Sequence, residues 1–178
     1  MVHATADQGS AGKRLRVGMV GGGRNAFIGA VHRMAMRLDD AIELRAGALS
    51  ADPDNARLSG ADLGLAPDRV YSDYREMAAR EAARPDGIEA VAIVTPNHLH
   101  HPVAKAFLEA GIDVICDKPL SASLVEAKEL VELTRAKGLV FAVTLNNTGY
   151  PMVRQAREMI ASGELGDIRV VHASYVQD

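Results

Sequence analysis

The sequence predicts an α/β fold in which helices cover both faces of a doubly wound parallel sheet. Short apolar runs alternate with segments of helical periodicity along most of the chain. These runs have the length of strands and carry few polar residues, as do strands that are buried on both faces. The first run leads directly into three glycines, Gly21, Gly22 and Gly23. A tight glycine turn of this kind joins the first strand to the first helix of a doubly wound sheet.

Composition and charge narrow the class of protein. Hydrophobic residues make up 48% of the chain and charged residues 24%, and the net charge is −3 with acids and bases interspersed. This balance is typical of a globular protein and gives no basic face for nucleic acid. No apolar stretch approaches the ~20 residues of a membrane-spanning helix, so we expect no membrane partner. The single cysteine, Cys116, cannot form an internal disulfide, and a cytoplasmic location is the expectation.

The first half of the chain predicts two strands and three helices. Residues 15–20 form the first strand, and residues 26–38 form a helix that would bury Ile28, Val31, Met34, Ala35 and Leu38. Residues 42–49 form the second strand. A helix from Pro53 to about Leu63 would be capped by Asp52 and ended by Gly64. Val70 and Tyr71 form at best a short strand, and Asp73 would cap the helix that follows.

The second half continues the alternation. Strands are expected over residues 90–94, 114–116 and 139–145. Between them lie a helix that ends near Gly111 and a longer helix that is capped by Ser121 or Ser123 and ended by Gly138.

The pattern changes after Asn147. Residues 151–162 predict a helix and residues 168–176 a long strand. One helix and one strand cannot form a core by themselves. We therefore expect a flexible tail over residues 1–14, a dinucleotide-binding domain over residues 15–147, and over residues 148–178 the start of an α/β substrate and oligomerisation domain that is cut short.

The glycine turn fits the pattern G-x-G-x-x-A. Its residues are Gly21, Gly22, Gly23, Arg24, Asn25 and Ala26. The first glycine permits the tight turn, Gly23 lets a pyrophosphate approach the backbone, and Ala26 keeps the helix near the strand. The turn has the strand–turn–helix context that a dinucleotide-binding (Rossmann) domain requires, and the alternative is a plain glycine-rich turn.

The choice between NAD and NADP stays open. Ser50 stands at the end of the second strand, where an acid normally binds the adenosine ribose of NAD. Asp52 would supply that acid if it turned inward, although a helix cap is the simpler interpretation.

Two further loops follow strands, at the edge of the sheet where ligands bind. The first carries Thr95, Pro96 and Asn97, and either His100 or His101 is expected to start a helix near the cofactor. Its histidines have no cysteine or carboxylate beside them, so we predict no metal. The second is Asp117-Lys118-Pro119. Lys118 would polarise a substrate hydroxyl or carbonyl or relay a proton, and the alternative is a solvated lysine before a helix.

Together these segments resemble the Gfo/Idh/MocA family of sugar and polyol dehydrogenases. The matching segments are 18–23, 92–100, 116–120 and 150–168. The resemblance implies an NAD(P) cofactor, cofactor contacts by Asp117, Lys118 and Pro119, and a catalytic Lys118 in a motif where Asp117 replaces the usual glutamate. It also implies a homo-oligomer when full length, and downstream catalytic Asp and His residues that this chain does not contain.

The resulting hypothesis is an NAD(P)-dependent oxidoreductase, present as an N-terminal part that binds the nucleotide but is inactive alone. A non-catalytic dinucleotide sensor or scaffold on the same fold is the alternative. A methyltransferase, whose cofactor loop is also rich in glycine, has no support from the loops at Thr95 and Lys118.

Overall fold

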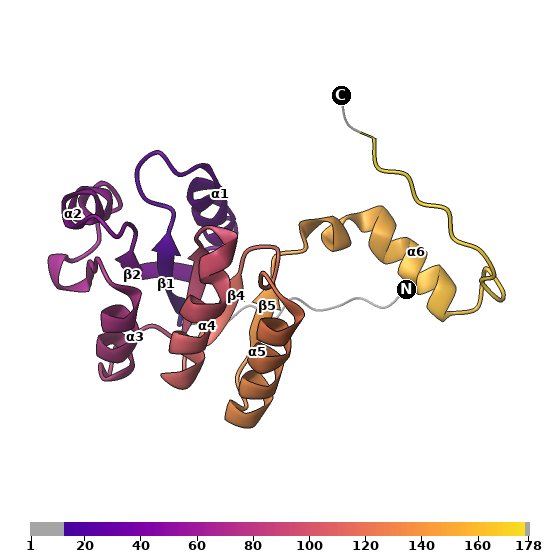
Figure 1. Ribbon diagram of the computed structural model, residues 1–178. Helices are drawn as coiled ribbons and strands as arrows, with labels where there is room; N and C mark the ends of the chain where they lie inside the picture. The colour runs from indigo at the N-terminus through magenta and orange to yellow at the C-terminus, as the bar shows by residue number, and fades with distance from the viewer. Residues whose placement is uncertain (1–12, 177–178) are drawn as a thin grey trace. The chain divides into compact units, whose positions relative to one another are not determined.

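The computed structural model describes residues 13–176, so the tail expected over residues 1–14 lies almost wholly outside the described residues. The chain divides into two compact units, Met1–Thr144 and Leu145–Asp178. The first unit contains a five-stranded sheet in the order β2-β1-β3-β4-β5, and every neighbouring pair is parallel (Figure 1). The predicted doubly wound parallel sheet is confirmed.

The strands lie close to their expected positions. They are β1 (Leu15–Gly21), β2 (Ile42–Ala48), β3 (Ala90–Val94), β4 (Asp113–Cys116) and β5 (Phe141–Val143). The last strand is shorter than expected because only these residues pair with β4. The short strand expected near Val70 is an isolated bridge to Gly47.

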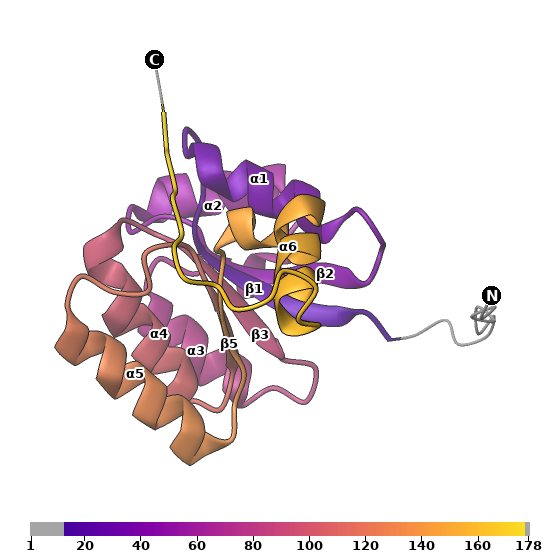
Figure 2. The same cartoon turned by 90° about the vertical axis from the view of Figure 1, so that its right-hand side faces the viewer.

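Helices cover the sheet on both sides (Figure 2). One side carries α1 (Phe27–Met36) and α2 (Pro53–Asp62), and the other carries α3 (Tyr74–Ala82), α4 (His100–Glu109) and α5 (Leu124–Lys137). Short 3-10 turns span Pro67–Arg69 and Asn97–Leu99.

Three helix starts are fixed by side-chain caps. Asp52 caps α2 and Asp73 caps α3, as predicted. Of the two serines expected to cap α5, Ser123 is the cap, and it forms a capping box with Glu126.

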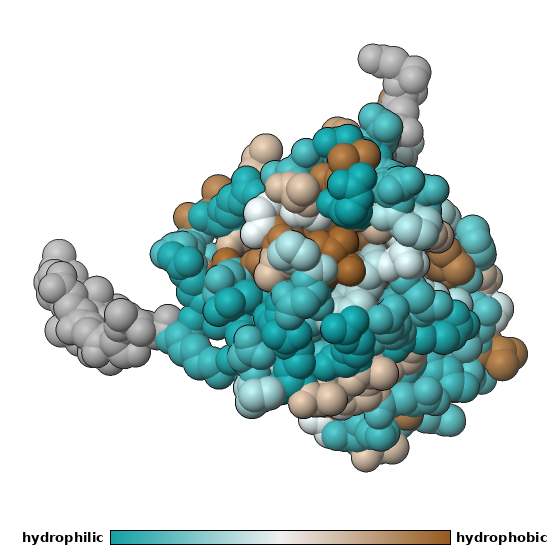
Figure 3. All heavy atoms as spheres, turned by 90° about the vertical axis from the view of Figure 1, so that its left-hand side faces the viewer, coloured by the Kyte–Doolittle hydropathy of each residue, from teal (hydrophilic) through white to brown (hydrophobic). Residues whose placement is uncertain are grey.

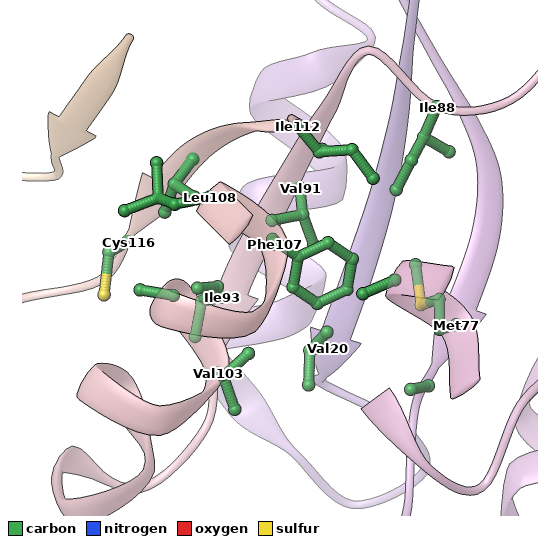
Figure 4. Packing of buried hydrophobic residues seen from close by; sticks show 14 of the residues in the cluster. Val20, Met77, Ile88, Val91, Ile93, Val103, Phe107, Leu108, Ile112 and Cys116 are labelled. Atoms are coloured by element: carbon green, nitrogen blue, oxygen red, sulfur yellow. The ribbon is translucent and has the colours of Figure 1, made fainter. Parts of the chain in front are cut away.

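Alternate residues of the central strand β3 enter two hydrophobic clusters. Val91 and Ile93 pack against α3 and α4, where Phe107 and Met77 are fully buried (Figure 4). Ala90 and Ala92 belong to the other cluster, on the side of α1. Small residues on that side let α1 lie close to the sheet. Burial of Phe107 alone stabilises the fold by about 1.5–3 kcal/mol.

The face that α1 buries differs from the predicted one. Val31, Met34 and Leu38 are 42%, 67% and 81% exposed, whereas Gly29 and Met36 are buried. Gly29 lies against Gly22, where a Cβ on Gly29 would be 2.5 Å from the Gly22 Cα. This close backbone contact sets the rotation of the helix, and hydrophobic spacing alone does not reveal it.

The second unit contains α6 (Pro151–Ala161), preceded by a 3-10 turn over Asn146–Gly149. The strand predicted over residues 168–176 is wrong, because these residues have no strand pairing. Val170 and Val171 are 70% and 79% exposed. An extended segment becomes a strand only when a neighbouring strand takes its backbone hydrogen bonds.

The surface of the first unit is largely polar on the side that carries α2 and α3, with one apolar area near its centre (Figure 3). Within residues 13–176, no helix is both long enough and apolar enough to cross a bilayer.

Candidate functional site

The glycine turn stands at the carboxyl end of β1, between β2 and β3. The connection that leaves β1 leads to β2 on one side, and the connection that leaves β3 leads to β4 on the other. Doubly wound sheets bind ligands at such a reversal of strand order. Gly22 has a φ of +72°, and a Cβ added to Gly23 would lie 2.7 Å from the Leu49 carbonyl oxygen. The turn therefore requires glycine at both positions, one for its conformation and one for its close approach to β2.

The backbone amides of the turn are largely occupied. The Gly23 amide donates to the Leu49 carbonyl and the Ala26 amide to the Gly23 carbonyl. Ala26 is the N-cap of α1 and provides no side-chain cap. The first-turn amides of α1 are thus the donors that remain for a pyrophosphate.

A cleft of about 380 Å³ opens beside the turn, lined by Gly22, Gly23, Arg24, Asn25 and Ala26 with residues of α1 and α2. At its rim Arg24 forms a two-pronged ion pair with Asp62, with Nε–Oδ2 and Nη2–Oδ1 distances of 2.6 and 2.8 Å. The hydrogen bond from Arg24 lowers the pKa of the Asp62 carboxyl. A bound phosphate would compete with Asp62 for this guanidinium.

Ser50 is the last residue in a series of hydrogen bonds that begins at the glycine turn. Its Oγ accepts from the Asp52 amide at 3.1 Å and from Asn55 Nδ2 at 3.2 Å. Asp52 uses its own carboxylate to cap α2, accepting from the Asn55 amide at 2.7 Å. The cap interpretation of Asp52 is confirmed, and no acid replaces Ser50 at the end of β2.

A second cleft of about 300 Å³ lies on the other side of the turn. Four predicted residues line it: Gly21, Ser50, Thr95 and Pro96. Thr95 Oγ1 is buried and lacks a hydrogen-bond partner among the described residues. Such a hydroxyl costs about 1–3 kcal/mol, which a ligand hydroxyl could offset. The two clefts thus lie beside the glycine turn, at the sheet edge where doubly wound sheets bind ligands.

His100 does not line either cleft. It is 1% exposed, and its ring lies between two loops. Nδ1 is 2.6 Å from the Pro119 carbonyl oxygen, and Nε2 is 3.0 Å from the Thr95 carbonyl oxygen. Asn97 is exposed and also lies outside both clefts.

The loop Asp117-Lys118-Pro119 follows β4 at the same edge of the sheet. The Asp117 amide donates to the Ile93 carbonyl, and Thr144 Oγ1 donates to Asp117 Oδ1 at 2.5 Å. His32 Nε2 of α1 lies 3.7 Å from the same carboxylate oxygen. Lys118 itself is exposed and, within residues 13–176, has no ion-pair partner.

Several residues that shape the site were not predicted from the sequence. Gly29 makes the close contact with Gly22, and Asn55 and Ser59 connect Ser50 to the turn. A small residue within a helix is a signal for Gly29, but nothing local distinguishes Asn55 or Ser59 from surface polar residues. Among the described residues there is no group of three or more potential metal ligands.

A family model described as an oxidoreductase family with an NAD-binding Rossmann fold matches residues 15–145. The chain belongs to the Gfo/Idh/MocA family. The predicted family, fold and nicotinamide dinucleotide cofactor are thereby confirmed. The match covers the glycine turn, both clefts and the Lys118 loop.

Individual relatives support the assignment of this chain to the Gfo/Idh/MocA family. An uncharacterised oxidoreductase, YfiI of Bacillus subtilis, is 45% identical over 164 residues, which are 92% of this chain and 42% of the relative. The crystal structure of an oxidoreductase from Sinorhizobium meliloti is 61% identical with a TM-score of 0.85, and the match covers 89% of this chain and 44% of that one.

An inositol dehydrogenase homologue from Azotobacter vinelandii, solved in complex with NADH and myo-inositol, is 48% identical with a TM-score of 0.83. The match covers 88% of this chain and 41% of that one. The chain thus spans less than half the length of each of these relatives.

Proposed function

We propose that the chain is the nucleotide-binding part of an NAD(P)-dependent dehydrogenase that acts on a sugar, polyol or related compound. One observation carries the proposal: the glycine turn after β1 and the exposed Lys118 after β4 stand at the same carboxyl edge of one parallel sheet. The A. vinelandii homologue, which binds NADH and myo-inositol, supports the same class of cofactor and substrate.

The residues of the turn would hold the dinucleotide. The first turn of α1 would bind the pyrophosphate, and Gly22 and Gly23 would allow its close approach. Ser50 would face the adenosine ribose, because it ends β2. When bound, the nicotinamide supplies the hydride acceptor or donor.

Lys118 would act on the substrate. Its ammonium group would hold or transfer the proton of the reacting hydroxyl. The Asp117 carboxylate is held by Thr144, so the backbone on the N-terminal side of Lys118 is fixed. We propose that the 178 residues bind the dinucleotide but show little turnover alone, because the relatives are more than twice as long.

Calorimetric titration of the chain with NADH, NADPH and S-adenosylmethionine tests the proposal. We expect binding of a nicotinamide dinucleotide and none of S-adenosylmethionine. Gly23→Ala should weaken dinucleotide binding about tenfold, because the new Cβ would lie 2.7 Å from a backbone oxygen and displace the turn.

Gly149→Ala is the matched control, since a Cβ there meets nothing within 4 Å. Tight binding of S-adenosylmethionine without either dinucleotide would refute the proposal. Fast turnover of a polyol by the 178 residues alone would refute the claim that they are inactive by themselves.

A further inference from the structure

His100 connects the two loops that follow β3 and β4. It is the first residue of α4, its side chain is buried, and each ring nitrogen points at a backbone carbonyl oxygen. One carbonyl belongs to Thr95 and the other to Pro119, which lie 24 residues apart in the sequence. A single side chain thus spans both loops.

The chemistry of the ring suits this position. Both partners are acceptors, so each contact requires an N–H from the ring. A neutral imidazole donates from one nitrogen and an imidazolium from both. Neither nitrogen is left to contact a cofactor, which separates His100 from the residues that line the clefts.

The two loops flank the half of the sheet that faces the nicotinamide. The adenosine half of a dinucleotide lies over the end of β2, so the nicotinamide half lies toward β3 and β4. Thr95 packs on the glycine turn, where its Cγ2 would be 3.2 Å from a Cβ on Gly21. Lys118 immediately precedes the carbonyl-bearing Pro119.

We propose that His100 is a positioning residue, which holds the Thr95 loop and the Lys118-Pro119 loop at the spacing that the nicotinamide half requires. It acts through the two carbonyl groups without touching the dinucleotide. The inference rests on the proposed function, because it presupposes that the chain binds NAD(P).

Binding of NADH and of ADP-ribose to the same variants tests the role of His100. ADP-ribose has the adenosine, pyrophosphate and ribose but no nicotinamide. His100→Phe keeps a planar ring and removes both ring nitrogens. We expect this variant to bind NADH about tenfold more weakly and its affinity for ADP-ribose to change by less than about twofold.

Two further variants separate the contacts and protect the test against misfolding. His100→Asn retains an amide donor near the Nδ1 position, and His100→Gln retains one near the Nε2 position. Each of these two variants should weaken NADH binding less than His100→Phe does. His101→Gln is the matched control, because the His101 ring pairs with Glu129 of α5, with Nε2–Oε2 at 2.8 Å, and bonds neither the Thr95 nor the Pro119 carbonyl.

Equal weakening of both ligands in the three His100 variants would show a general effect on folding and would overturn the proposal. Unchanged NADH binding in all three would overturn it as well. If the unaltered chain bound neither ligand, the proposed function itself would fail, and the role of His100 with it.

Discussion

The Ser59 hydroxyl oxygen lies 3.0 Å from the Arg24 backbone nitrogen and accepts its hydrogen bond. Ser59 lies in α2 and is 2% exposed, and Arg24 follows the glycine turn. Ser59 in turn donates to Asn55 Oδ1 at 3.3 Å, and Asn55 Nδ2 donates to Ser50 Oγ at 3.2 Å. Three side chains therefore join the end of β2 to the turn after β1, so Ser50 and the glycine turn are held together.

Ser59→Ala should weaken dinucleotide binding several-fold. The change leaves the Arg24 amide and the Asn55 carbonyl oxygen without a partner, at a cost of about 1–3 kcal/mol. Titration with NADH measures the effect. Ser162→Ala is the control, because that hydroxyl donates to the Met159 carbonyl of α6, which is remote in sequence from the glycine turn. Equal affinity of the Ser59 variant and the control would show that the contact does not organise the turn.

Ser50→Asp should weaken NADPH binding at least about tenfold, while the affinity for NADH changes little. Ser50 Oγ already accepts two hydrogen bonds, so its own hydrogen is available to donate to a ribose oxygen or a 2′-phosphate. A carboxylate at this position repels the 2′-phosphate. Parallel titrations with NADH and NADPH provide the comparison. If both affinities stayed the same, Ser50 would not face the adenosine ribose.

Gly29→Ala should destabilise the protein and impair nucleotide binding, although alanine favours helices by about 1 kcal/mol. The added Cβ would lie 2.5 Å from the Gly22 Cα, a backbone atom that cannot rotate away. Overpacking of this kind costs about 1–3 kcal/mol. Urea unfolding and NADH titration measure the two effects, with Gly149→Ala as the open-space control. A stabilised Gly29 variant with normal binding would contradict the close packing of α1.

Tyr71 should make the protein less stable at alkaline pH. Burial, followed by the hydrogen bond to Glu81, raises the pKa of the Tyr71 hydroxyl from 10.0 to about 12. Between these values the unfolded chain loses the proton while the folded chain retains it, so unfolding becomes easier as the pH rises. The free energy of unfolding of Tyr71→Phe, measured from pH 9 to 12, should therefore fall less steeply than that of the unaltered protein. If the free energies of unfolding of the two proteins fell in parallel with pH, the raised pKa of Tyr71 would be contradicted.

The buried carboxylate of Glu81 makes the stability of the protein sensitive to substitution around Tyr71. Its carboxylate is 1% exposed and accepts from the Tyr71 hydroxyl at 2.8 Å and from the Ile88 amide at 3.3 Å. Arg69 Nη2 lies 3.5 Å from the same group. Glu81→Ala should cost about 1–3 kcal/mol, because it leaves the Tyr71 hydroxyl and the Ile88 amide without their acceptor. Arg69 keeps its ion pair with Asp86, at 3.0 Å. Urea unfolding measures the loss, and Glu132→Ala, at an exposed position of α5, should change stability by less than about 0.5 kcal/mol.

Local rules predicted most of the fold. Caps such as Asp52, Asp73 and Ser123 depend on contacts within a few residues, so the helix starts could be located from the sequence. Packing between distant segments was not accessible in this way. The exposed Met34 of α1, the exposed Leu38 just after this helix and the unpaired residues 168–176 show where hydrophobic spacing alone misled the prediction.

The sequence by itself determined the alternation of strands and helices, the glycine turn and the family, because these depend on residue type and short-range order. It also located Lys118 and Thr95 at strand ends. Only the tertiary structure decided that His100 joins two loops, that Ser59 supports the turn from α2, and that Gly29 presses against Gly22. Each of these contacts joins segments separated in sequence, and their geometry exists only after the chain has folded.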